Sequence, residues 1–188
     1  MTTKKVLELA CLFLGKQDLT KTVLFDETGA DATDEDKNDI EILLKCLNLI
    51  LSEIAIDYLP IVKRKTITLT DKKVDVKSID SRIQEVLSLK NGGINVPYKI
   101  LGSDLYADAN CCEIEYKVHP TEVALTDTCE DFAGRIADRV LAYGVCMEYC
   151  FISLLYDDAQ VWENKFKNAL MADCRKKSEL RLKKRRFI

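Results

Sequence analysis

The chain has 188 residues, of which 47% are hydrophobic and 31% charged, and its formal net charge is −3 at pH 7. This length fits one domain, or one domain with a small insertion, and the apolar content excludes general disorder. No apolar run reaches the roughly 18 to 20 uninterrupted residues that a bilayer-spanning helix needs, so we expect no membrane segment.

The first predicted element is a helix over residues 3–14, because apolar residues recur there at helical spacing and Gly15 follows as a stop signal. Its basic start and short apolar stretch imitate a signal peptide. Glu8 interrupts that stretch, however, and no small-residue cleavage pattern follows it. We therefore expect synthesis in the cytosol.

A longer helix is predicted over residues 34–59, where apolar residues form a continuous stripe at three- and four-residue spacing. Thr33 and the acidic residues after it suit a helix N-terminus, through capping and through the helix dipole. Pro60 is expected to end this helix.

Beyond Pro60 the apolar period changes to two, which is typical of half-buried strands. The alternation occurs in residues 63–71, around 74–79, over 85–100 and in 112–118. Asn91-Gly92-Gly93 supplies a hairpin turn within the third stretch. The pattern predicts a small antiparallel β domain over residues 63–120.

Helical spacing returns after Thr126-Asp127 and predicts helices over residues 131–156 and 157–177, with Asp157-Asp158 starting the second. Their inward faces are predicted to be Phe132, Ile136, Val140, Tyr143, Met147 and Cys150 or Phe151, then Val161, Trp162, Phe166, Ala169 and Leu170. Because helices flank the β stretch, we expect an α+β fold, mainly α. Residues 1–62 and 121–174 form a helical bundle in this prediction, and the β domain is inserted between its helices.

No catalytic, metal-binding or cofactor-binding residue is predicted. His119 is the only histidine, and it precedes Pro120 without a paired acid or nucleophile. Cys146 and Cys150 lie four residues apart, yet the chain lacks the repeated cysteine pairs of a structural zinc site. The acidic stretch 26–39 does not fit a calcium loop, and no phosphate-binding glycine motif occurs.

The eight cysteines are predicted to be reduced thiols, since no export signal is recognised. Cys46, Cys146 and Cys150 fall within apolar helical stretches, where a thiol behaves as a small hydrophobic group. We expect these three to lie in the core.

The last 14 residues, 175–188, contrast with the rest of the chain. They hold eight basic residues and one acidic residue, a net charge of +7, which leaves −10 for the other 174 residues. Three interpretations are open: a solvated helix end, an arm that neutralises nucleic-acid phosphates, or an arm that docks in an acidic groove of a partner protein. The docking interpretation also explains the apolar tip. Its residues are Arg175, Lys176, Lys177, Arg181, Lys183, Lys184, Arg185, Arg186, Phe187 and Ile188.

Two long stretches carry a resemblance to a known family. They are "DIEILLKCLNLILSEIAIDYLPIVKRKTITL" and "RIADRVLAYGVCMEYCFISLLYDDAQVWENKFKNAL", separated by the β-rich middle. Together they resemble the head-to-tail adaptor, or connector, proteins of tailed bacteriophages, in particular the podovirus type, whose helical bundle carries an inserted β domain. The resemblance spans about residues 34–175 and rests on element order and these stretches.

The resemblance implies a non-enzymatic virion protein of the head-tail neck, made in the cytoplasm of the host bacterium. It implies a ring, commonly of twelve copies, between the portal protein and the next tail protein. DNA would pass through the channel without sequence-specific binding, and residues 175–188 would grip the portal. The alternative is a nucleic-acid-binding phage accessory protein that uses the same basic segment.

Overall fold

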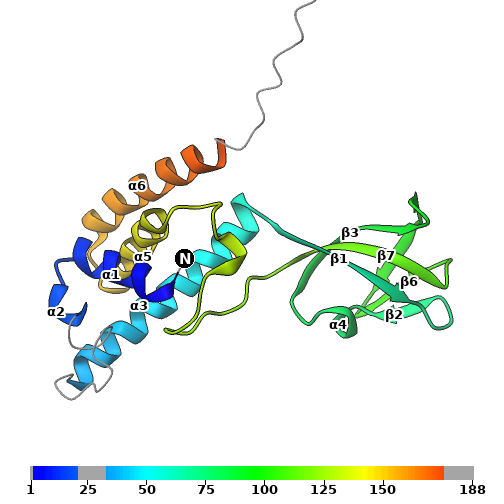
Figure 1. The fold of residues 1–188 in the computed structure, drawn as a ribbon, viewed down its shortest axis with the longest axis horizontal. Helices are drawn as coiled ribbons and strands as arrows, with labels where there is room; N and C mark the ends of the chain where they lie inside the picture. The colour runs from blue at the N-terminus through cyan, green and yellow to red at the C-terminus, as the bar shows by residue number, and fades with distance from the viewer. Residues whose placement is uncertain (1, 21–32, 176–188) are drawn as a thin grey trace, which may run out of the picture. The chain divides into compact units, whose positions relative to one another are not determined.

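The computed structural model describes residues 2–20 and 33–175 (Figure 1). It is an α+β fold in which the N- and C-terminal helices pack together and two antiparallel sheets are inserted between α3 and α5. The predicted fold class is confirmed. The chain divides into a helical unit, from residues 1–51 and 122–188, and a β unit, residues 52–121.

The helical unit contains α1 (Thr3–Phe13), α2 (Gln17–Leu19), α3 (Asp34–Glu53), α5 (Asp138–Ile152) and α6 (Tyr156–Arg175). A short 3-10 helix, η3 (Glu130–Phe132), precedes α5. The α5 helix packs against both α1 and α6, which brings together segments from the two ends of the chain. None of the described helices combines the length and the apolar composition that a membrane-spanning segment requires.

The α3 helix begins as its sequence predicts, with a reciprocal cap. The Thr33 hydroxyl accepts a hydrogen bond from the Asp36 backbone N–H at 3.1 Å, and the Asp36 carboxylate accepts one from the Thr33 N–H at 3.0 Å. The chain then widens into a π-helical turn, η2 (Ile54–Tyr58), before Pro60. The predicted end of this helical segment is confirmed.

The C-terminal helices differ from prediction in three places, and one of them is the end of α5, which lies at Ile152 rather than at residue 156. The first helix was expected from residue 131, but α5 begins at Asp138, because Gly134 adopts φ = +69° and interrupts the helical backbone. Val161, expected to face inward, is exposed, whereas of the alternatives Cys150 and Phe151 the first is buried and the second is exposed. The acidic first turn of α6 is confirmed, and residues 176 and 177 of the predicted last helix lie outside the described residues.

The core of the helical unit includes free, buried thiols at Cys11, Cys46, Cys129, Cys146 and Cys150. The predicted core positions of Cys46, Cys146 and Cys150 are therefore confirmed. The Cys146 thiol also donates a hydrogen bond to the Ala10 carbonyl oxygen at 3.7 Å, which links α5 to α1.

The β unit holds two sheets, where the sequence indicated one small β domain. The first has the strand order β1-β7-β3-β4, and the second β2-β6-β5. The strand bounds are β1 (Ile61–Thr68), β2 (Lys73–Asp75), β3 (Ile83–Asn91), β4 (Ile94–Asn95), β5 (Tyr98–Leu101), β6 (Asp104–Ala107) and β7 (Cys111–Val118). All named pairs are antiparallel.

Local turn chemistry explains the details of these sheets. Asn91 pairs with Ile94 across Gly92-Gly93, whose positive φ angles suit a two-residue hairpin turn, so the predicted hairpin is confirmed. The stretch 74–79 was expected to be strand. Only its first two residues belong to β2, because the Asp75 carboxylate caps the short helix α4 (Val76–Ile79).

Candidate functional site

The predicted docking arm falls almost entirely outside the described residues. Arg175 is the last residue of α6. The other nine predicted arm residues lie outside the described residues: Lys176, Lys177, Arg181, Lys183, Lys184, Arg185, Arg186, Phe187 and Ile188.

The residues weighed for chemistry are not gathered into a reactive centre. His119 is exposed just after β7, and its backbone N–H donates to the Arg82 carbonyl oxygen at 2.9 Å. Within residues 2–20 and 33–175, no group of three or more His, Cys, Asp or Glu side chains is placed to hold a metal ion.

The exposed face of the first sheet carries paired charges. Arg64 donates from Nε and Nη2 to Glu115 Oε1 at 2.9 and 2.8 Å, and Ser88 donates to the other carboxylate oxygen at 3.2 Å. Lys117 binds Glu85 at 2.6 Å on the same face. The hydrogen bond from Arg64 is the main reason that the pKa of Glu115 lies below its usual range. These cations are already compensated, so this face is poorly suited to a polyanion.

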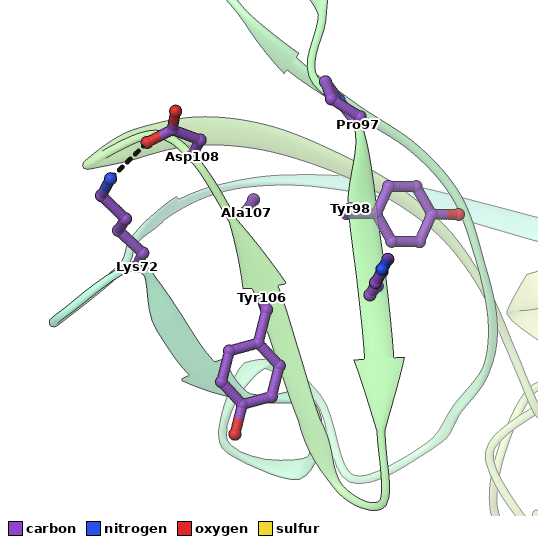
Figure 2. A pocket seen from close by; sticks show the side chains of 7 residues that line it. Lys72, Pro97, Tyr98, Tyr106, Ala107 and Asp108 are labelled. Atoms are coloured by element: carbon purple, nitrogen blue, oxygen red, sulfur yellow. Dashed lines mark ion pairs between the residues drawn. The ribbon is translucent and has the colours of Figure 1, made fainter.

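The second sheet bears a shallow pocket of about 430 Å³ (Figure 2). Tyr106 of the central strand β6 stands between Lys73 and Lys99 in the strand register. The Lys73 ammonium lies 5.7 Å from the Tyr106 ring centroid. The pocket lining consists of Lys72, Pro97, Tyr98, Lys99, Tyr106, Ala107 and Asp108.

Two of the cations around this pocket are paired. Lys72 binds Asp108 at 2.6 Å, as the dashed line in Figure 2 marks, and Lys73 binds Asp104 at 2.7 Å. The Lys72–Asp108 ion pair, the further cation Lys99 and one exposed aromatic ring line this pocket, whose size suits a small ligand. They offer little attraction to a nucleic-acid backbone, whose binding depends on phosphate neutralisation.

The most conspicuous surface of the helical unit is an apolar turn between α5 and α6, defined here as residues 151–156. Its five large apolar side chains are between 39% and 69% exposed: Phe151, Ile152, Leu154, Leu155 and Tyr156. The exposed acids Asp157 and Asp158 follow directly. Sequence reasoning missed this surface, because it placed these residues within one continuous helix.

Comparison with known proteins leaves the family open: no family model matches the chain, and no curated protein matches its sequence.

Proposed function

We propose that this chain is a structural subunit of the head-to-tail adaptor of a tailed bacteriophage. In this proposal, copies form a ring, commonly of twelve, between the portal protein and the next tail protein, with a channel for DNA. The protein is made in the bacterial cytoplasm, and its working location is the neck of the virion.

One observation carries the proposal: the helices before and after the β unit pack into a single helical unit. This is the element order on which the resemblance to podovirus-type adaptors rests. The apolar turn adds support, since contiguous exposed apolar residues rimmed by polar ones are typical of protein–protein contacts. The function proposed is assembly rather than catalysis.

A nucleic-acid-binding accessory protein is the second candidate, and the +7 charge of residues 175–188 favours it. The described surfaces support it less. Arg64, Lys117, Lys72 and Lys73 are each bound to a carboxylate. Nucleic-acid binding in this chain would therefore depend on the C-terminal segment.

Light scattering of the full-length protein, alone and mixed with purified portal, tests the proposal. We expect a complex with the portal whose mass corresponds to a ring of copies on each portal. A duplex-DNA sample run in parallel tests the second candidate. If the protein bound DNA tightly and did not bind the portal, the adaptor function would be rejected in favour of the nucleic-acid-binding accessory protein.

A further inference from the structure

The tip of the β3–β4 hairpin carries the sequence Asn91-Gly92-Gly93. Asn91 is the only one of the seven asparagines in the chain that precedes a glycine. The side-chain amide of an asparagine can be attacked by the backbone nitrogen of the next residue. Glycine favours this attack, because it has no side chain to shield its nitrogen and its backbone rotates freely. The sequence therefore singles out Asn91 as a candidate for deamidation.

The groups that would react are exposed and not held in place. Asn91, Gly92 and Gly93 are all exposed. Among the described residues, no hydrogen bond involves the Asn91 side-chain amide or the Gly92 N–H. A Cβ atom built at Gly92 would meet no atom within 4 Å, so the surroundings of Gly92 are open. The Asn91 side chain can therefore turn toward the Gly92 nitrogen without displacing a neighbour.

The hairpin must open locally before the two groups can react. Asn91 is the last residue of β3, and an extended backbone holds the nitrogen of the following residue away from the side-chain carbon. This opening is easy at the tip, because β4 has only two residues and lies at the edge of its sheet. Short, exposed strand ends open at a low free-energy cost. The fold therefore gives Asn91 little protection.

We propose that Asn91 is a site of spontaneous deamidation in the folded protein, an inference that does not depend on the adaptor function. The Gly92 nitrogen forms a bond to Cγ of Asn91, the Cγ–Nδ2 bond breaks, and ammonia leaves with the proton of the Gly92 N–H. Water then opens the resulting five-membered succinimide at one of its two carbonyl carbons. One opening gives aspartate at position 91. The other gives isoaspartate, whose main chain runs through the former side-chain carbon.

The two products should affect the hairpin differently, although both add one negative charge at pH 7. Aspartate leaves the main chain unchanged, so the pairing of residue 91 with Ile94 can persist. Isoaspartate adds one carbon to the main chain directly before the turn, which shifts β4 against β3. The hydrogen bond from the Val96 N–H to the Leu89 carbonyl oxygen, 2.8 Å in the unmodified hairpin, reports on this shift.

Incubation of the full-length native protein at pH 7, followed by peptide mass spectrometry, tests the proposal. We expect the mass gain of an amide-to-acid change at Asn91, with separate chromatographic peaks for aspartate and isoaspartate. Asn95 is the internal control, because it is exposed on the same hairpin but precedes the β-branched Val96, so it should react at least about tenfold more slowly. Asn91→Gln is the matched control variant. Its longer side chain disfavours ring closure, and its peptide mass should stay unchanged.

A parallel incubation in urea separates the effect of the sequence from that of the fold. Asn91 in the native protein should react within about tenfold of its rate in the unfolded chain, since the hairpin opens readily. Protection of Asn91 in the native protein alone would overturn the inference, as would equal reaction at Asn95. In the isoaspartate fraction, hydrogen exchange at the Val96 N–H should be faster than in the aspartate fraction. Equal exchange in the two fractions would refute the shift of β4.

Discussion

Gly144 of α5 lies directly against Ile50 of α3. A Cβ atom built at Gly144 would stand 2.9 Å from Ile50 Cγ2 and 3.0 Å from Ile50 Cδ1, closer than real Cβ contacts. Ile50 is fully buried. The glycine therefore allows the close approach of two core helices, even though a glycine inside a helix costs about 1 kcal/mol relative to alanine.

Gly144→Ala should lower the free energy of unfolding by about 1 to 3 kcal/mol, because overpacking outweighs the gain in helix propensity. Urea titration followed by circular dichroism measures the change. Ile50→Ala alone should cost about 2 to 5 kcal/mol through the cavity that it leaves. The double variant should cost less than both together, since each change relieves the other. An increase in stability with Gly144→Ala would show that the two helices are not in tight contact.

Burial raises the pKa of the Glu148 carboxyl on α5. Unfolded glutamate titrates near pH 4.3, so between that pH and the folded pKa the unfolded chain binds fewer protons than the folded one. This group's contribution to stability therefore falls as the pH rises through that window. The stability of Glu148→Gln minus that of the parent chain should therefore be larger at pH 7 than at pH 3.5.

Glu41→Gln is the control with opposite sign. The hydrogen bond from Lys45 lowers the pKa of the exposed Glu41 carboxyl, so its contribution is present above the unfolded pKa and is lost as the pH falls through the folded pKa. Urea titrations of both variants at the two pH values make the comparison. Identical stability differences at pH 3.5 and pH 7 for Glu148→Gln would show that partial burial does not raise the pKa of this carboxyl.

The cysteines should differ sharply in reactivity, because the thiolate is the nucleophile. Burial, with a smaller contribution from nearby Glu148, raises the pKa of Cys46 to about 12, whereas Cys111 is exposed. A short iodoacetamide pulse on the native protein should label Cys111 first and leave Cys46 unmodified, as peptide mass spectrometry would show. In denaturant without reductant, all eight cysteines should react. Two or more native disulfides would contradict the proposed cytosolic assembly.

Much of the fold could be predicted because its signals are local. The apolar stripe of residues 34–59, the cap at Thr33 and the stop at Pro60 act within a few residues of one another, and α3 and η2 follow them. The hairpin at Gly92-Gly93 is equally local. Such local features are present in the folded protein because tertiary packing favours the same structure as the local sequence does.

The rest depended on distant partners or on unusual backbone positions. The short strand β6 is defined by its pairing with β2 and β5 and has little pattern of its own. The role of Gly144 requires Ile50 on another helix. The apolar turn was hidden because leucine, unlike glycine, gives no sequence signal for a left-handed helix end. The candidate surface therefore lies where the sequence departs from the usual preference for glycine at a left-handed helix end, since Leu154 has φ = +61°.

Deletion of residues 175–188 tests the docking arm proposed from sequence. Folding should remain intact, because Leu170 is the last fully buried residue among the described side chains of α6. Attachment to portal-containing heads should be lost, since the segment holds the +7 charge and both apolar anchors. Cosedimentation with heads measures attachment, and circular dichroism checks the fold. Normal attachment by the truncated protein would show that residues 175–188 are not needed for binding to the portal.

Phe187→Ser with Ile188→Ser separates apolar anchoring from charge. The variant keeps the whole +7 charge, so its association rate with heads should change little, because long-range charge sets the encounter rate. Its dissociation should be faster, since most affinity differences within one interface arise in the off-rate. Low salt strengthens charge steering, so weaker attachment that persists there points to lost apolar burial. Full recovery of attachment at low salt would instead mean that charge alone holds the arm, as a nucleic-acid-binding segment requires.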